Sequence, residues 1–221
     1  MERKQPQLPR LPELDSLPLE PDFAALAALC RQEDSPVAGR RVKGAVLTGE
    51  DLSGLSVSGV AFEGCRFLGC RLEGASFTDV LFQGCDLSNS VFPDGFFQRV
   101  WFHSCKGIGA VFSESRLRQV TMERSLLSFA NFDGAKVQGM RIQSSKLDGA
   151  SLTQCELKTV SLEEVDFTGT NFFHTPLAGL DFTASTLEGI QVSSELLELR
   201  GAIVTAYQAA GLAELMGLVV K

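Results

Sequence analysis

Cysteine is the residue of this sequence whose spacing first suggests chemistry. Five of the six cysteines, Cys65, Cys70, Cys85, Cys105 and Cys155, stand after residue 42 at positions that end in 0 or 5. A row of thiols could bind a metal or undergo redox chemistry, but the Cys-x-x-Cys pairs typical of such sites are missing from the row. The regular spacing therefore favours structural packing, in which a buried cysteine behaves as a small hydrophobic residue.

Two histidines and a pair of adjacent carboxylates are the other candidates for catalysis. His103 and His174 lie far apart in the chain, and Glu163 is followed directly by Glu164. Nucleophilic or acid–base catalysis requires side chains that converge on one substrate. Whether these groups can converge depends on the elements that carry them.

A five-residue period organises the chain from Val42 to Leu197. Every position in this interval whose number ends in 2 or 7 is apolar, 32 in succession, with Gly107 as the single exception. Small side chains often stand two positions before these central residues. Glycine stands two positions after them in the first seven units, from Gly44 to Gly74.

This period fits neither a helix, with about 3.6 residues per turn, nor a plain strand, with about two. It fits a chain that turns a corner every five residues, with central and small side chains inward and a positive-φ residue, often glycine, at each corner. Four corners close a square coil, and stacked coils pair as parallel strands roughly 4.8 Å apart. Residues 41–199 therefore predict an all-β solenoid of about eight coils, roughly 38 Å long.

Such a rod has consequences for chemistry. The histidines and the paired glutamates fall on outward columns of a convex surface, so nothing converges on them. A filled rod also lacks the concave pocket that ligands usually occupy. The sequence predicts a non-enzymatic protein without a catalytic site, cofactor or metal.

Several units match the A(D/N)LXX consensus of the pentapeptide-repeat family, among them 85–89 (Cys-Asp-Leu-Ser-Asn) and 130–134 (Ala-Asn-Phe-Asp-Gly). The chain resembles this family over about 155 residues. The resemblance implies a right-handed quadrilateral β-helix; the period by itself does not give the hand.

Composition excludes other classes of protein. The 221 residues carry a net charge of −7, which argues against a broad surface for direct binding of nucleic acid. No run of 18 apolar residues predicts a membrane span, and the first residues do not resemble a signal peptide. We therefore expect a cytoplasmic protein whose cysteines remain reduced.

The N-terminal flank, residues 1–40, combines a proline-rich arm with a capping helix. The pattern predicts a helix from Phe23 to Gln32 with Asp22 as its N-cap and Leu26, Leu29 and Cys30 as its apolar stripe. The flank is either a lid over the open end of the solenoid or a docking peptide for a partner.

The C-terminal flank, residues 200–221, is predicted to form a helix from Ala202 to Met216, with Gly217 as its C-cap residue and a short strand-like tail. The run Gly201-Ala202-Ile203-Val204 and the tail 217–220 resemble the C-terminal module of the Qnr-type quinolone-resistance branch of the family. That resemblance implies an end-to-end homodimer. It also implies an acidic rod that resembles a DNA duplex and occupies DNA gyrase.

Three surfaces are candidates for contact with partners. Residues 41–120 hold eight basic and eight acidic residues, whereas residues 121–200 hold six basic and eleven acidic ones. The candidate acidic partner surface is Glu156, Glu163, Glu164, Asp166, Asp181 and Glu188. The candidate apolar partner patch is Leu81, Phe96 and Trp101. The candidate dimer contacts are Ile203, Tyr207, Ala210, Leu212, Leu215 and Met216. Solvation of the acidic residues, and packing of the apolar patch under the N-terminal arm, are the alternatives.

These features predict a DNA-mimic-like protein that binds a type II topoisomerase, DNA gyrase or topoisomerase IV, and protects it from quinolones or a toxin. The alternative is an interaction scaffold for another protein partner. The repeat is uninterrupted, whereas Qnr-type proteins carry loops that matter for protection.

Overall fold

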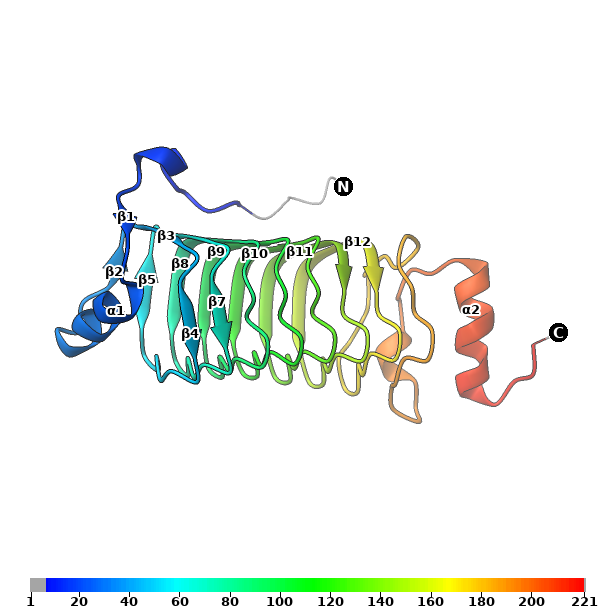
Figure 1. Cartoon of the computed structure of the whole chain (residues 1–221). Coiled ribbons are helices and arrows are strands. Elements are labelled where there is room, and N and C mark those ends of the chain that lie inside the picture. Colours follow the sequence, from blue (N-terminus) through cyan, green and yellow to red (C-terminus); the bar gives the residue numbers. More distant parts are fainter. Residues whose placement is uncertain (1–6, 221) are drawn as a thin grey trace.

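The protein is a rod of stacked β-coils with a helix at each end, as seen in the computed structural model, which describes residues 7–220 (Figure 1). The N-terminal flank comprises η1 (Leu14–Ser16), β1 (Leu19–Glu20) and α1 (Phe23–Gln32). The strands that follow are β2 (Val37–Ala38), β3 (Arg41–Lys43), β4 (Val46–Thr48), β5 (Ser56–Ser58), β6 (Ala61–Glu63), β7 (Arg66–Leu68), β8 (Ser76–Gln83), β9 (Phe96–His103), β10 (Arg116–Glu123), β11 (Lys136–Lys146) and β12 (Glu156–Asp166). The C-terminal flank comprises η2 (Leu197–Leu199), α2 (Ala206–Ala213) and η3 (Glu214–Met216).

Each regular coil pairs in parallel with the coil twenty residues further along the chain. Val42 pairs with Phe62, Phe62 with Phe82 and Phe82 with Phe102. The backbone groups of one coil therefore bond to the coils on either side of it, and a lateral sheet edge does not arise. The prediction of an all-β solenoid is confirmed, with about seven turns rather than eight.

The four faces of the rod are named here by their outward positions. Face A carries positions 61, 81, 101, 121, 141 and 161, face B positions 66, 86, 106, 126, 146 and 166, face C positions 71, 91, 111, 131, 151 and 171, and face D positions 76, 96, 116, 136 and 156. The long strands β8 to β12 run along face D and continue round a corner onto face A. The D–A corner is therefore at positions 79, 99, 119, 139 and 159.

The corners require a left-handed backbone. At Gly64 φ is 59°, and a Cβ at this position would meet nothing within 4 Å, so conformation rather than space favours glycine there. Other corners hold the same conformation without glycine, as at Asp79 and Thr159, where φ is 55° and 56°. The predicted glycine column is therefore a column of residues with positive φ. Where the residue is not glycine, the backbone hydrogen bonds between coils offset its conformational strain.

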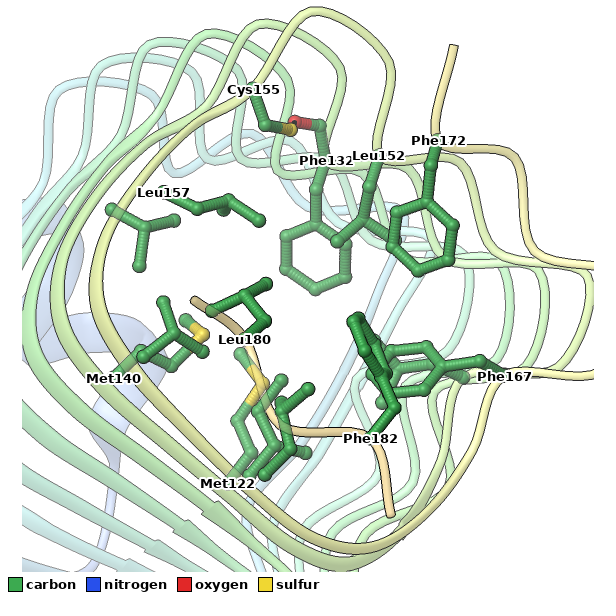
Figure 2. Close-up of a pocket in the computed structure, with 15 residues that line it drawn as sticks. Met122, Phe132, Met140, Leu152, Cys155, Leu157, Phe167, Phe172, Leu180 and Phe182 are labelled. Atoms are coloured by element: carbon green, nitrogen blue, oxygen red, sulfur yellow. Dashed lines mark hydrogen bonds between the residues drawn. The ribbon is translucent and has the colours of Figure 1, made fainter. Parts of the chain in front are cut away.

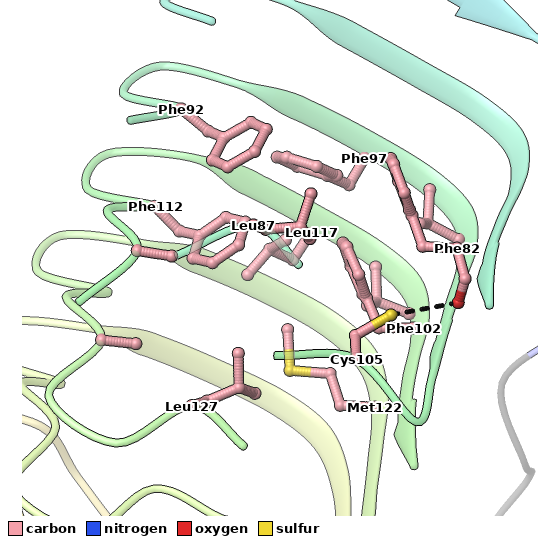
Figure 3. Close-up of a cluster of buried hydrophobic side chains, with 14 of the residues drawn as sticks. Phe82, Leu87, Phe92, Phe97, Phe102, Cys105, Phe112, Leu117, Met122 and Leu127 are labelled. Carbon is pink, nitrogen blue, oxygen red and sulfur yellow. Dashed lines mark hydrogen bonds between the residues drawn. The ribbon is translucent and has the colours of Figure 1, made fainter. Parts of the chain in front are cut away.

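Stacked phenylalanine rings fill the first two thirds of the rod (Figure 3). Phe82 lies between Phe62 and Phe102, with ring centroids 5.0 and 5.1 Å away. A second stack places Phe112 5.0 Å from Phe92 and 5.1 Å from Phe132. These separations are close to the rise of one coil, about 4.8 Å, so each ring packs on the ring of the next coil.

The inward column of small residues adds hydrogen bonds between coils. The Ser90 hydroxyl donates to the Phe67 carbonyl at 2.7 Å, and the Cys105 thiol donates to the Phe82 carbonyl at 3.2 Å. Serine, threonine and cysteine are therefore satisfied inside an apolar core. At Gly107, the exception in the central column, the Leu127 side chain fills the space: a Cβ there would lie 2.9 Å from Leu127 Cδ2.

An apolar hollow of about 30 Å³ lies in the last third of the core (Figure 2). It is lined by central residues that are smaller than phenylalanine, including Val137, Ile142 and Leu152. Leu152 interrupts the face C stack between Phe132 and Phe172, which also line the hollow. The hollow therefore marks the coils where the aromatic stacks lapse.

The regular register ends in the last coil. Asp181 pairs with Ile203, which is twenty-two residues away. The last coil therefore contains two residues more than a regular coil of twenty. The prediction that Leu197 points inward is wrong, because its exposed fraction is 51%. Glu198 is buried instead, and its carboxylate accepts hydrogen bonds from the Ser193 hydroxyl and the His174 backbone N–H, both at 2.8 Å.

The N-terminal end of the rod is closed by β1 and α1. Asp22 accepts a hydrogen bond from the Ala25 N–H, which confirms the predicted N-cap. Phe23 enters the core with its ring 5.1 Å from that of Phe62. Leu29 was expected in the apolar stripe but is 49% exposed, while Ala27 takes its place in the core.

The C-terminal helix is shorter than predicted. It begins at Ala206 rather than Ala202, because Ile203 still belongs to the ladder and Thr205 forms a capping box with Gln208. Gly217 has a φ of 76°, as expected of a C-cap glycine. The predicted strand-like tail has no strand in residues 218–220, and Lys221 lies outside the described residues.

Deleting residues 136–155 tests the coil register. Residue 156 stacks on residue 136, so this deletion should leave a folded rod that is shorter by one coil. Deleting Gly134 alone should place inward residues outside and unfold the coils that follow. Circular dichroism and thermal unfolding of both variants measure the difference, and equal damage from both would contradict the register.

Leu152→Phe tests the hollow. The new ring continues the stack between Phe132 and Phe172, so we expect the free energy of unfolding to rise by about 1 kcal/mol. The matched control, Leu87→Phe, adds the same ring at a buried site that does not line the hollow, where overpacking should cost about 1–3 kcal/mol. Urea unfolding measures both changes, and a loss of stability in Leu152→Phe would show that the hollow cannot accept a ring.

Candidate interaction surfaces

Three of the six predicted acidic residues, Glu163, Glu164 and Asp166, gather beside the corner between faces A and B, and we name them the acidic corner. Glu188 lies at the other end of face B, one residue before the corner at Gly189. Glu163 pairs with Arg141 at 3.0 Å, and the Ser144 hydroxyl donates to Glu164 at 2.8 Å. Hydrogen bonds from Thr168, with a smaller contribution from Lys146, lower the pKa of Asp166, so this carboxylate stays charged at neutral pH.

Glu156 lies elsewhere, on face D, among basic residues. It pairs with Lys136 and Lys158, each at 3.6 Å. Together with Arg116 and Arg118 these lysines form the basic face, which borders a shallow groove of about 260 Å³. The charge around Glu156 is therefore positive rather than acidic, and sequence reasoning missed this surface. Its signal was the recurrence of lysine and arginine at multiples of twenty residues, Arg116 with Lys136 and Arg118 with Lys158.

Asp181 is separate from both groups. It begins the last coil on face A, where it pairs with Ile203, and its carboxylate accepts hydrogen bonds from the Thr183 N–H at 3.1 Å and hydroxyl at 2.7 Å. This arrangement closes a turn at the end of the rod. The predicted acidic surface is thus divided over three faces.

The predicted apolar patch is covered by the N-terminal arm, residues 7–17. Leu81 is buried together with Leu17 and Ala61, and Trp101 packs against the same cluster. Of the two alternatives, packing under the arm therefore describes Leu81. Phe96, on face D, is half-buried and lies outside this cluster.

The C-terminal end exposes apolar side chains. Tyr207 is 82% exposed and Met216 66% exposed, and α2 buries none of its residues. Ile203 and Leu215 are also exposed, whereas Ala210 is half-buried and Leu212 packs against the core. A groove of about 660 Å³ lies between α2 and the last coil, although the Gln208 side chain ties the two through the Phe182 and Ser185 carbonyls at 2.8 and 2.6 Å.

The chemistry considered for cysteine does not fit its surroundings. All six cysteines are buried as free thiols. The contact with the Cys105 thiol, together with burial, raises the pKa of Cys85 to about 12, and burial raises that of Cys155 to about 12. Such thiols are poor nucleophiles and poor metal ligands at neutral pH.

The histidines lie apart. His103 Nδ1 is 3.4 Å from Glu123 on face A, and the His174 ring contacts Phe173 with a centroid distance of 3.9 Å. Within residues 7–220 no cluster of three His, Cys, Asp or Glu side chains is arranged to hold a metal ion. The helices of the same residues are too short or too polar to cross a membrane.

Comparison with known proteins identifies the repeat. A model described as the pentapeptide repeat region matches residues 55–132, and one of eight pentapeptide repeats matches residues 141–172 and 150–189. The chain belongs to the pentapeptide-repeat family. Among curated protein sequences, none matches the chain significantly.

Solved structures of other pentapeptide-repeat proteins are similar in fold. A trypsin-treated variant of QnrB1, a plasmid-mediated fluoroquinolone resistance protein, is 22% identical over 84% of this chain and 93% of its own, with a TM-score of 0.50. HetL, from the cyanobacterium Nostoc and involved in regulating heterocyst differentiation, is 16% identical over 80% of this chain and 90% of its own, with a TM-score of 0.35. At these identities the likeness concerns the fold alone.

Proposed function

We propose that this pentapeptide-repeat protein is a non-enzymatic homodimer that binds another protein through its surface. The observation that carries the proposal is the position of the acidic corner, which lies in the coils nearest the exposed apolar C-terminal end. If two copies associate through that end, their acidic corners lie on either side of the junction. The rod would then present a continuous acidic region at its centre.

The apolar C-terminal end supports the dimer. Tyr207, Met216 and Val219 are among the most exposed large apolar side chains of the described residues. They lie close together in the chain, and contiguous exposed apolar surface commonly marks a protein interface. The groove between α2 and the last coil gives this end a shape that a second copy can fill.

The acidic corner supports a partner that binds DNA. An enzyme that holds duplex DNA presents lysine and arginine spaced to contact phosphates. A rod with carboxylates on one corner can occupy such a surface in place of the duplex. We propose a type II topoisomerase, DNA gyrase or topoisomerase IV, as the partner, and protection from quinolones or a toxin as the result. The name of QnrB1, a fluoroquinolone resistance protein, supports this choice of target.

An interaction scaffold is the second candidate, and the basic face supports it. Arg116, Arg118, Lys136 and Lys158 stand on one face of the rod and would repel a DNA-binding surface. They suit an acidic protein partner instead. The two candidates therefore use different faces of the same rod and can be separated by charge reversal.

Substitution of Tyr207 and Met216 by glutamate tests the dimer. Both side chains are largely exposed in the single chain, so the substitutions should leave the unfolding temperature unchanged. Loss of apolar contacts of this kind should weaken the dimer by about 2 kcal/mol, about 30-fold in Kd. Light scattering and sedimentation measure the change, with Glu195→Lys, an exposed residue that does not line the groove, as control. A parent protein that is monomeric at micromolar concentration would contradict the dimer.

Charge reversal at the acidic corner tests the partner. We expect the parent protein to alter DNA supercoiling by gyrase, with or without a fluoroquinolone, and the double variant Glu163→Lys, Glu164→Lys to lose this effect. The control Glu156→Lys, on the basic face, should retain it. The effect of the parent should also fade as salt rises, because exposed charges are screened over about 10 Å at 0.1 M salt. A parent that leaves gyrase unaffected at low salt would favour the scaffold.

A further inference from the structure

The N-terminal arm has a repeat of its own. Leucine recurs every third residue at Leu8, Leu11, Leu14 and Leu17, and proline follows three of these four leucines. A polyproline II helix has about three residues per turn, so leucines at this spacing share one side of it. At Glu13 φ and ψ are −53° and 131°, and at Leu17 they are −73° and 129°, which are close to polyproline II values. The backbone is therefore extended on both sides of η1 (Leu14–Ser16), and the leucines recur at a constant spacing along the arm.

The arm lies lengthwise on the rod, crossing coil after coil (Figure 1). Three of its leucines face the apolar positions of face A: Leu17 is buried with Ala61 and Leu81, and Leu11 and Leu14 pack on the same cluster, whereas Leu8 is 50% exposed. Most of the contact is made by side chains rather than by the coil ladder. Only β1, beyond the end of the arm, pairs as a strand with the rod.

Two hydrogen bonds fix the register of the arm. The Arg10 N–H donates to Asp79 Oδ1 at 2.8 Å, and the Gln7 N–H donates to Gln119 Oε1 at 2.7 Å. The donors are three residues apart in the arm, and the acceptors are two coils apart at the D–A corner. Three residues of polyproline II rise about 9.3 Å, and two coils rise about 9.6 Å. The spacing of the two donors along the arm therefore matches the spacing of the two acceptors along the D–A corner.

The first acceptor is held in place by the rod itself. Arg99, in the coil between the two acceptors, donates to both carboxylate oxygens of Asp79 at 2.6 Å. The hydrogen bond from Arg99 is the main reason that the pKa of Asp79 is below its ordinary value, so the acceptor remains charged. An acceptor fixed in this way does not depend on the arm for its position.

The arm covers a polar side-chain atom with which it forms no hydrogen bond. Trp101 Nε1 is buried without a hydrogen-bond partner among the described residues. A buried donor without an acceptor is unfavourable, so a segment that supplied an acceptor there would fit better. The arm is also external to the coils, so that its release breaks no coil-to-coil hydrogen bond.

We propose that face A and the D–A corner form a binding site for an extended segment of a partner protein, with leucine at every third residue and proline beside it, and that the N-terminal arm occupies this site until the partner displaces it. The apolar cluster of Leu81 and Trp101 selects the leucines. The acceptors at Asp79 and Gln119 set the register of the bound backbone. The site lies on the coils of residues 61–119, whereas the acidic corner lies at residues 163–166, so the proposal does not depend on the proposed function.

A truncated chain and a synthetic peptide test the site. Residues 1–17 are removed, which leaves β1 in place, and a peptide of residues 7–17 is added. Trp101 is the only tryptophan of the chain and lies under the arm, so its fluorescence reports occupancy directly. We expect saturable binding of the peptide to the truncated chain. Binding to the full-length chain should be about ten-fold weaker or worse, because the tethered arm competes at high effective concentration.

Matched variants distinguish binding of the peptide in a defined register from nonspecific apolar binding. A peptide with Leu8, Leu11 and Leu14 replaced by serine should bind about ten-fold more weakly or not at all. The variant Asp79→Ala, Gln119→Ala of the truncated chain should weaken the parent peptide to a similar degree, whereas Asp94→Ala, at a corner that the arm does not touch, should not. Equal binding of the serine peptide, or no binding to a truncated chain that circular dichroism shows to be folded, would overturn the proposal.

A second measurement applies if the truncated chain fails to fold. In the full-length chain, Leu11→Ser with Leu14→Ser should loosen the arm and increase the quenching of Trp101 by acrylamide. Addition of the parent peptide should then restore protection. Protection of Trp101 that is unchanged by these substitutions, or that the peptide fails to restore, would show that the arm is a fixed cover rather than the occupant of an exchangeable site.

Discussion

The rod depends on one constraint, which is that the backbone must return to the same lateral position after twenty residues. The N–H groups of one coil then meet the carbonyls of its neighbour on every face, as in the succession from Val42 to Phe102. Each corner needs a left-handed residue, and the ladder is strong enough to hold even Thr159 in that conformation. Aromatic stacking follows from the same closure, because identical positions lie one coil apart.

The coils and the short capping elements could be predicted because their signals are local. A five-residue period specifies which side chains point inward, and Asp22 marks the start of α1 by its own hydrogen bond. The five-residue period did not predict the last coil, which contains two additional residues. There Leu197 is exposed and Glu198 is buried, the reverse of what the period predicts. An insertion of that size has no signature in composition and becomes evident only from the pairing of Asp181 with Ile203.

The surfaces were harder to predict than the core because they depend on the twenty-residue period rather than the five-residue one. Net charge along the chain placed Glu156 in an acidic field, yet its neighbours in space are Lys136 and Lys158. Residues of one face are separated in sequence by three other faces. The course of the arm was beyond sequence reasoning for a related reason, as its leucines have a period of their own and their match to Leu81 and Trp101 requires the coil spacing.

The two ends of the rod differ, and the difference limits how large an assembly can become. A solenoid with two bare ends would stack head to tail without limit, because each terminal coil is a template for the next. Here Phe23 and Ala27 of α1 seal the first coil, while the apolar side chains around Tyr207 remain exposed at the other end. If copies associate through that end, as proposed above, each joins one other copy and growth stops at two. Unequal caps of this kind would keep a rod-shaped molecule from forming filaments.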